Sequence, residues 1–256
     1  MSEAAQVLRQ VRYTNKAFWR NPASAFFTFA FPLMFLVIFT SLLSNGQITI
    51  GNQEIDLSTY YVMAEAAFGV ISACFTNIAI SVTFQRDQGI LKRTRGTPLP
   101  GWAYLTARVV HAMTIAFVLV AITVAFGVIF YSASVPTGIP LVQFVLTLLV
   151  GGLSFAALAL ALTAAIPNAD AAPPIVNAAV LPLLFLSGIF FPTDDAPTWI
   201  TAVANIFPVR HFFEAMSSAF LGNAIPFDWW DLVVVAAWGI VGLVLASRFF
   251  SWEPRK

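Results

Sequence analysis

Cysteine, histidine and charged residues are scarce in this chain of 256 residues, which has one cysteine, two histidines and 10% charged side chains. The single cysteine, Cys74, cannot form an intramolecular disulfide, and its apolar surroundings are typical of a small buried residue. So few histidines and cysteines do not supply the clustered ligands of a metal site, and we expect no metal centre. His111 and His211 are interpreted as hydrogen-bonding residues near the ends of apolar runs.

Motifs for nucleotide binding, hydrolysis and nucleic-acid binding are missing too. The pattern G-x-x-x-x-G-K-[ST] does not occur, so the chain does not bind ATP through a P-loop. No serine–histidine–acid arrangement is indicated, and no dense basic tract is interleaved with aromatic residues. We therefore expect no catalytic residue, no cofactor in this chain and no nucleic-acid partner.

Apolar residues are abundant instead. They make up 59% of the chain, with a mean hydropathy of +0.83, whereas soluble domains have about 45–50%. The apolar runs do not alternate as barrel strands do, and each has 18 to 26 residues, close to the ~20 that cross a bilayer as a helix. The sequence predicts an all-α integral membrane protein, one domain over 1–256, with six transmembrane helices at about 25–43, 60–82, 109–131, 140–165, 174–191 and 232–250.

Residues 4–20 have the spacing of an amphipathic helix, with Arg9, Arg12, Lys16 and Arg20 beside an apolar stripe. Such a helix next to a span is expected to lie on membrane lipids at the anionic cytoplasmic surface; a mobile tail is the alternative. The run 25–43 is longer than the apolar core of a signal peptide, so we expect an uncleaved first span.

The distribution of lysine and arginine predicts the topology. With both termini in the cytoplasm, twelve of these residues lie in cytoplasmic segments and only Arg210 lies outside. Positive charge is retained on the cytoplasmic side of membrane proteins. The segment 85–100 is therefore predicted to be cytoplasmic, and 192–231 to be on the outer side.

The outer segment 192–231 contains two short runs with helical spacing, separated by Pro208 and closed by Gly222. Neither run is long enough to span. We expect an outer re-entrant helical hairpin that dips into the outer leaflet, with Trp229 and Trp230 marking the interface before the last span.

Two features inside the spans have two readings each. Glu65 lies about five residues from the outer interface, where it is either part of a transport path or an interfacial glutamate that reaches the surface. Ala157, Ala161 and Ala165 recur every four residues, which indicates either a close-packed helix seam or only an alanine-rich span.

The polar, basic stretch from Gln85 to Pro100 is the longest expected cytoplasmic loop between spans. Arg86, Lys92, Arg93 and Arg95 fall within ten positions of it. By composition alone, two interpretations of this loop are equally good. It is either a docking site for a cytoplasmic partner or a linker that only sets the membrane topology.

Two motifs give the chain a resemblance to a known family. The loop is similar to the segment E-R-E/D-x-G-x-L-x-R-x-x-x-T-P-L of ABC-2 type ABC exporter permeases, with a glutamine at position 85 where glutamate is usual. The second motif is Leu186-Ser-Gly-Ile-Phe-Phe-Pro192, followed by Ala196-Pro197-Thr-Trp199 and Phe207-Pro208. The resemblance covers nearly the whole chain and is close to the daunorubicin and multidrug-resistance permeases of actinobacteria. The matching loop residues are Arg86, Asp87, Gly89, Leu91, Arg93, Thr97, Pro98 and Leu99.

This resemblance implies a permease of the bacterial plasma membrane that dimerises with itself or a related permease. It also implies two separate ABC ATPase subunits that hold ATP and Mg²⁺, with the matching loop residues forming a coupling helix that docks in the ATPase. Family cargos are drugs, antibiotics, lipids and polysaccharides, and the aromatic spans favour a hydrophobic or amphipathic one.

Two other functions are weighed against this one. An ion- or proton-coupled secondary carrier would use Glu65, and a non-transporting membrane scaffold would stimulate no ATPase.

Overall fold

The structure is a computed structural model, and it describes residues 3–43, 46–50, 53–133, 135–193, 196–222 and 225–253. Residues 194–195, 223–224, Arg255 and Lys256, on which parts of the predictions fall, lie outside the described residues. The elements in chain order are α1 (Glu3–Trp19), α2 (Pro22–Leu43), β1 (Gln47–Ile50), β2 (Gln53–Asp56), α3 (Leu57–Ile71), the π-helix η1 (Ser72–Thr76), α4 (Asn77–Asp87), α5 (Ile90–Arg95), α6 (Gly101–Tyr131), α7 (Ile139–Leu162), α8 (Ala172–Leu186), α9 (Thr198–Ala204), α10 (Pro208–Leu221) and α11 (Trp229–Phe249).

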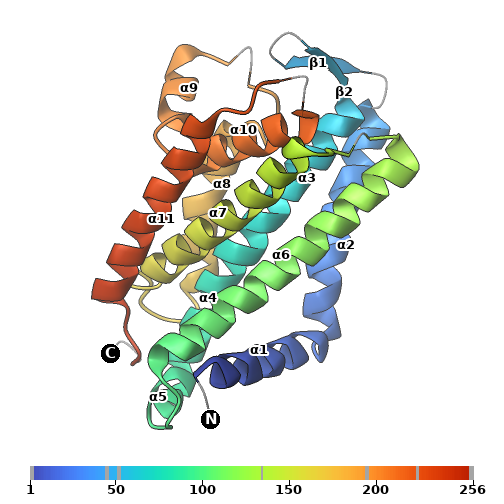
Figure 1. The fold of residues 1–256 in the computed structure, drawn as a ribbon. Coiled ribbons are helices and arrows are strands. Elements are labelled where there is room, and N and C mark those ends of the chain that lie inside the picture. The colour runs from blue at the N-terminus through green and yellow to red at the C-terminus, as the bar shows by residue number, and fades with distance from the viewer. Residues whose placement is uncertain are drawn as a thin grey trace.

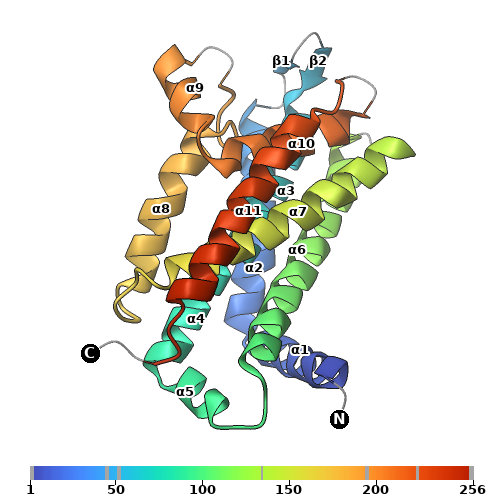
Figure 2. The same ribbon diagram turned by 60° about the vertical axis from the view of Figure 1, so that its left-hand side comes forward.

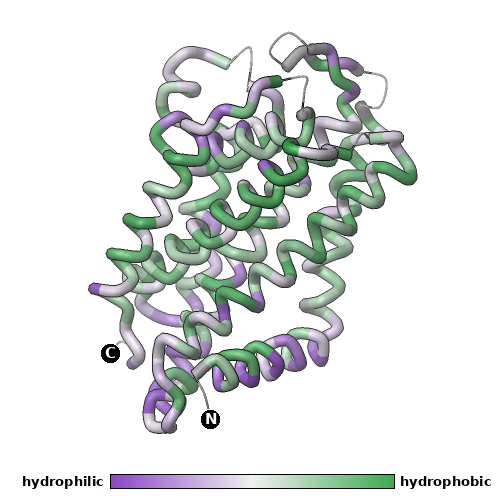
Figure 3. Tube along the Cα trace, in the orientation of Figure 1, coloured by the Kyte–Doolittle hydropathy of each residue, from purple (hydrophilic) through white to green (hydrophobic). Residues whose placement is uncertain are grey.

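The long helices lie side by side in one bundle with two distinct ends (Figures 1 and 2). We call the end with α1, α5 and the end of α11 the α5 end, and the end with β1, β2 and α9 the hairpin end. Hydrophilic residues concentrate on α1 and around α5, whereas the middle of the bundle is mostly hydrophobic (Figure 3). The bundle thus has an apolar middle zone between two polar ends, as expected of a protein in a bilayer.

Five helical stretches of the described chain are long and apolar enough to cross a membrane: 25–42, 57–87, 101–131, 139–162 and 229–249. The predicted sixth span, 174–191, is a 15-residue apolar helix, α8. At 1.5 Å per residue it is about 22 Å long, shorter than the ~30 Å hydrocarbon core. The structure therefore supports five long spans plus one short helix rather than six full spans.

Helix α8 is short because its backbone turns before the apolar sequence ends. Gly188 has φ of +90°, a left-handed conformation that glycine adopts readily. Its carbonyl accepts a hydrogen bond from the hydroxyl of Tyr60 in α3. Ile189 and the residues after it therefore continue as a loop at the hairpin end.

The second predicted span is a continuous helical stretch with a π-helical segment in its middle. Residues 72–76 form η1 between α3 and α4. Directly after it, Asn77 is exposed although it lies ten residues inside the α4 end of the stretch. A π-helical turn inside a helix often accompanies a functional site.

The outer segment forms the two predicted short helices, α9 and α10, with Pro208 at the start of α10 and Gly222 at its end. Most of α10 is buried, and it packs against α3, α7, α8 and α11. Protein, rather than solvent, surrounds this helix. Entry of the pair into a membrane leaflet stays a prediction.

The antiparallel hairpin of β1 and β2 was not predicted. Its register pairs Gln47 with Asp56 and Ile48 with Ile55. Four-residue strands are too short to give a clear alternating pattern, and the flanking apolar runs dominate the local sequence.

Close helix packing occurs between α7 and α11, with the small residues supplied by α11. A Cβ added at Gly242 would lie 2.7 Å from the backbone nitrogen of Leu158, and Gly239 approaches Ser154 in the same way. Of the predicted alanines, Ala157 lies at this contact, whereas Ala161 and Ala165 line a neighbouring cavity between α7, α8 and α11. The seam interpretation is thus correct for one alanine of the three.

Candidate functional site

The loop predicted to bind a partner begins with a tight turn at the α5 end. Gly89 separates α4 from α5 and has φ of +70°. No other atom lies near the place where its Cβ would be, so the backbone conformation rather than packing requires glycine here. This turn directs α5 away from the axis of α4 (Figure 2).

Helix α5 has one buried side chain and several exposed cations. Leu91 is fully buried in the core, which anchors the six-residue helix to the bundle. Lys92, Arg93 and Arg95 are exposed, and Lys92 lies 3.9 Å from the carboxylate of Glu253. The arrangement presents positive charge outward on a helix whose position is fixed from within.

The end of α4 is bonded to the connection between α7 and α8. Arg86 is 1% exposed, and its two terminal nitrogens donate to the carbonyl oxygens of Thr163 at 2.7 Å and Ile166 at 2.6 Å. The carboxylate of Asp87 accepts from the backbone N–H of Ala169 at 3.2 Å. Arg86 therefore cannot contact a docked partner in this conformation; it joins two connections at the α5 end.

The remaining motif residues form the return from α5 to α6. Thr97 donates to the carbonyl of Thr94 at 2.6 Å and accepts from the N–H of Leu99. Pro98 is exposed, and Leu99 is half-buried. A small polar cavity of about 310 Å³ separates this return from α1, and its lining residues are Gln6, Arg9, Gln10, Tyr13, Thr94, Thr97, Pro98 and Leu99.

Gln85, the position where the motif departs from its usual residue, lies inside the bundle wall. Its amide bonds the hydroxyl of Tyr104. An amide is oriented by its hydrogen bonds, and with its oxygen toward Arg108 it accepts from both terminal nitrogens of that residue, at 2.9 and 3.2 Å. Arg108 also donates to the hydroxyl of Ser81 at 2.7 Å. An acid at position 85 would thus face Arg108.

Glu65 is 4% exposed, so the alternative of a glutamate that reaches the membrane surface does not agree with the structure. One carboxylate oxygen, Oε2, is buried without a hydrogen-bond partner among the described residues. Gly69 lies against Leu119, and Val62 against Gly127, so antiparallel α3 and α6 bring Glu65 level with Thr123. The carboxylate of Glu65 therefore faces the interior of the helix bundle of this chain.

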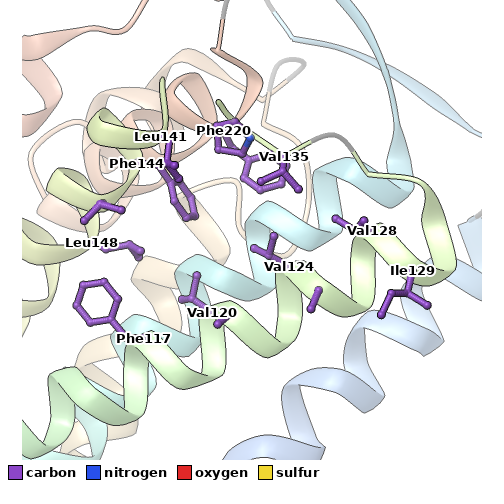
Figure 4. A pocket seen from close by; sticks show the side chains of 14 residues that line it. Phe117, Val120, Val124, Val128, Ile129, Val135, Leu141, Phe144, Leu148 and Phe220 are labelled. Atoms are coloured by element: carbon purple, nitrogen blue, oxygen red, sulfur yellow. The ribbon is translucent and has the colours of Figure 1, made fainter. Parts of the chain in front are cut away.

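An apolar groove of about 440 Å³ lies between α6 and α7 towards the hairpin end (Figure 4). Val120, Val124 and Val128 form one wall, Phe144 and Leu148 the other, and Phe220 of α10 lies beside them. Its size is in the range of small-molecule sites, about 300–1,000 Å³.

A polar cluster at the hairpin end surrounds His211. Its Nδ1 is 2.6 Å from a carboxylate oxygen of Asp231, and its Nε2 is 2.9 Å from the carbonyl oxygen of Asn205. Burial alone lowers the pKa of His211, but these two hydrogen bonds and the charges of Asp231 and Glu214 outweigh it and raise that pKa above its usual value. Both histidines form side-chain hydrogen bonds, as predicted; His111 bonds Asn15 of α1 at 2.6 Å.

His211, Glu214 and Asp231 also bring potential metal ligands within 4.8 Å of one another, which the sequence did not predict. In the described structure these groups bond protein partners: Arg210 donates to Glu214 at 2.7 Å, and acceptors face both ring nitrogens of His211. The cluster is therefore described as a hydrogen-bonded network.

The sequence profile of the ABC-2 type transporter family matches residues 5–221. The chain belongs to the ABC-2 type transporter family. The matched residues form the membrane permease domain of such a transporter. ABC-2 permeases pair with ABC ATPase subunits.

Several individual proteins are similar to this permease. The probable multidrug ABC transporter permease YbhR of Escherichia coli is 26% identical over 190 residues, 73% of this chain and 51% of that protein. The putative transport permease ycf38 of Porphyra purpurea is 22% identical over 228 residues, 88% of this chain and 76% of that protein. The putative transport permease YvfS of Bacillus subtilis is 22% identical over 228 residues, 89% of this chain and 90% of that protein. The permease thus spans about half the length of YbhR.

The structure brings the predicted loop residues together at the α5 end but gives them different environments. Arg93 and Pro98 are exposed, whereas Arg86 and Leu91 are buried. The acceptors of Arg86 in the connection between α7 and α8 were not predicted, because carbonyl groups leave no signal in a sequence. The contact between Gln85 and Arg108 was not predicted either, since only the crossing of α4 and α6 brings these residues together.

Proposed function

We propose that this permease is the membrane subunit of an ATP-driven exporter that moves a hydrophobic or amphipathic molecule out of the cytoplasm or the inner leaflet. The observation that carries this proposal is the construction of α5. Leu91 of α5 is buried in the core, whereas the cations of α5 are exposed. The adjacent Arg86 and Asp87 bond the connection between α7 and α8. Because α5 is anchored in this way, a partner that displaces it would also displace the segments bonded to it.

In the proposed mechanism the α5 end faces the cytoplasm of a bacterial cell, and α8 crosses the membrane as a short sixth span. Two ABC ATPase subunits bind ATP and Mg²⁺ and close around them, and each moves one α5. The hydrogen bonds of Arg86 carry this displacement to the α7–α8 connection, so that α4, α7 and α8 shift together. Two permeases, identical or related, enclose the path between them.

The apolar groove between α6 and α7 supports a hydrophobic or amphipathic cargo. Its lining is hydrophobic, and most of that lining comes from α6 and α7, two of the long apolar helices (Figure 4). A cargo dissolved in the membrane would reach this groove without passing through water. The name of YbhR, a probable multidrug ABC transporter permease, is in line with such a cargo.

Reconstitution with the ABC ATPase that co-purifies with the full chain tests this proposal. Hydrolysis in vesicles should rise when a cargo from a panel of apolar and amphipathic compounds is added. In Arg93→Glu this stimulation should fall about tenfold or more, because a reversed charge opposes a complementary surface. Lys16→Glu, the same reversal on exposed α1, is the matched control. Equal stimulation in wild type and Arg93→Glu would contradict the role of α5.

The secondary-carrier alternative predicts a different dependence. Transport would follow an ion gradient, ignore ATP and require Glu65. Since Glu65 lies inside one bundle, it can meet a cargo only if α3 and α6 separate. We therefore place no step of the proposed export cycle on Glu65.

A further inference from the structure

The partners of Arg108 carry an inference that does not depend on the exporter proposal. Arg108 is half-buried, and its hydrogen-bond partners, the hydroxyl of Ser81 and the amide of Gln85, are both neutral. Within the described part of the chain, no carboxylate lies within ion-pair distance of it. A half-buried guanidinium with only neutral acceptors retains a net positive charge that an anion would stabilise.

The position of Arg108 along the bundle indicates which anions can reach it. Helix α6 has 31 residues and is therefore about 46 Å long, about 16 Å longer than the hydrocarbon core. Arg108 lies seven residues after Gly101, about 10 Å from the start of the helix. The guanidinium is thus near the level where the polar headgroups of the adjacent leaflet meet the acyl chains.

A groove begins at Ser81, the residue that accepts a hydrogen bond from Arg108, and extends into the apolar zone. It has a volume of about 310 Å³ and lies between α2, the α3–η1–α4 stretch and α6. Ser81, which accepts from Arg108, lines its end nearest α5, and Phe68 lines the other end. The two residues are thirteen positions apart, which corresponds to about 20 Å along a helix. Phe27, Phe31 and Leu119 supply apolar walls.

The neighbouring helix α1 concentrates anions at the same place. Asn15 bonds His111, one helical turn from Arg108, so α1 passes beside the site. Its Arg9, Arg12, Lys16 and Arg20 are exposed. A basic helix at a membrane surface attracts anionic lipids.

We propose that Arg108, with Ser81 and Gln85 beside it, binds the phosphate of an anionic phospholipid in the leaflet at the α5 end, and that an acyl chain of this lipid lies in the groove between α2 and the α3–η1–α4 stretch. Phosphate oxygens suit the donor fork of arginine, and the groove supplies the apolar contact that a free anion lacks. The bound lipid would link α2 to α4, directly before α5.

Native mass spectrometry of the purified full chain tests this site with phosphatidylglycerol and phosphatidylcholine. Wild type should bind one phosphatidylglycerol more tightly than phosphatidylcholine. In Gln85→Glu the new carboxylate neutralises Arg108 from within, so this preference should fall about tenfold. Gln88→Glu adds the same charge at an exposed position of the same loop, and its preference should stay within about twofold of wild type.

A further variant and a competing small anion identify the bound anion and its source. Arg108→Gln should lose the preference like Gln85→Glu; should it fail to fold, Gln85→Glu still decides, because that variant keeps the arginine. Glycerol 3-phosphate, which has the phosphate but no acyl chain, should not displace the bound lipid. Displacement by glycerol 3-phosphate at equal concentration would overturn the lipid assignment in favour of a small-anion site. An equal loss in Gln88→Glu and Gln85→Glu would overturn the site in favour of general surface charge.

Discussion

Arg86 of α4 donates to the carbonyl oxygen of Thr163 at 2.7 Å, across 77 positions of the chain. The same guanidinium reaches Ile166 at 2.6 Å, and the side chain is 1% exposed. A charged donor thus closes the end of α7, where helical carbonyls otherwise lack partners. This bond unites the segment that bears α5 with the connection to α8.

Replacing Arg86 should destabilise the permease strongly. Arg86→Ala removes two hydrogen bonds to a charged donor and leaves two carbonyls without it, at a cost of about 3–5 kcal/mol. Arg86→Lys should recover only part of this, since an ammonium lacks the fork that bonds both carbonyls. Thermal unfolding in detergent measures the effect, with Arg95→Ala on exposed α5 as control, expected to change stability by less than about 0.5 kcal/mol. Equal melting temperatures for Arg86→Ala and Arg95→Ala would refute the role of Arg86.

Glu65→Gln should maintain or raise stability. Its Oε2 is buried without a partner among the described residues, and burying an ionised carboxylate costs far more than burying an amide of the same shape. ATP-dependent transport should persist, because the exporter mechanism assigns no step to this acid. Both are measured on the reconstituted complex, by thermal unfolding and by cargo uptake. Loss of transport with retained folding would support the ion-coupled alternative instead.

The network around His211 should make stability depend on pH. Because the pKa of His211 is raised in the folded chain above its value of about 6.5 in the unfolded chain, its protonated form stabilises the fold. This contribution is fully present below about pH 6.5 and is lost as pH rises through the higher folded pKa. Melting temperatures of wild type and His211→Gln between about pH 5 and pH 9 measure it.

The difference between wild type and His211→Gln should therefore shrink towards alkaline pH. The groups that face His211 are Asp231, Glu214 and the Asn205 carbonyl. Asp231→Asn is the control, since it removes one charge that favours the protonated ring and should reduce the pH-dependent difference. A difference that grows with pH would show that the ring is stabilised in its neutral form.

Five of the six predicted spans are long apolar helices in the structure, because an apolar run of about 20 residues is the length that a helix needs to cross a bilayer. The orientation predicted from lysine and arginine stays a prediction. The two short helices at 198–221 were also predicted, since Pro208 and Gly222 mark their ends. The length of α8 was not, because the apolar run continues past Gly188 and only the left-handed backbone there ends the helix. No residue pattern distinguishes the π-helix at 72–76 from the α-helices on either side of it. The exposure of Asn77, directly after it, is likewise apparent only in the structure.

The candidate site was predicted as a stretch, but the environment of each residue was not. The motif alone does not show that Arg86 is a buried hydrogen-bond donor, that Leu91 anchors α5 in the core, and that Arg93 is an exposed cation. That distinction arises where α4, α7 and the 163–171 connection meet. It changes the expected effect of each substitution: loss of stability at Arg86, and loss of partner contact at Arg93.

Cysteine crosslinking tests the docking of α5 most directly, since the native Cys74 is fully buried. Arg93→Cys places one accessible thiol on α5, and Gln47→Cys places one on exposed β1 at the opposite end of the bundle. Each variant is treated with a short thiol–amine crosslinker in membranes that contain the co-purifying ABC ATPase. We predict a permease–ATPase adduct for Arg93→Cys and none for Gln47→Cys. An adduct from Gln47→Cys alone, or from neither variant while the ATPase still co-purifies, would contradict the assignment of α5 as the coupling helix.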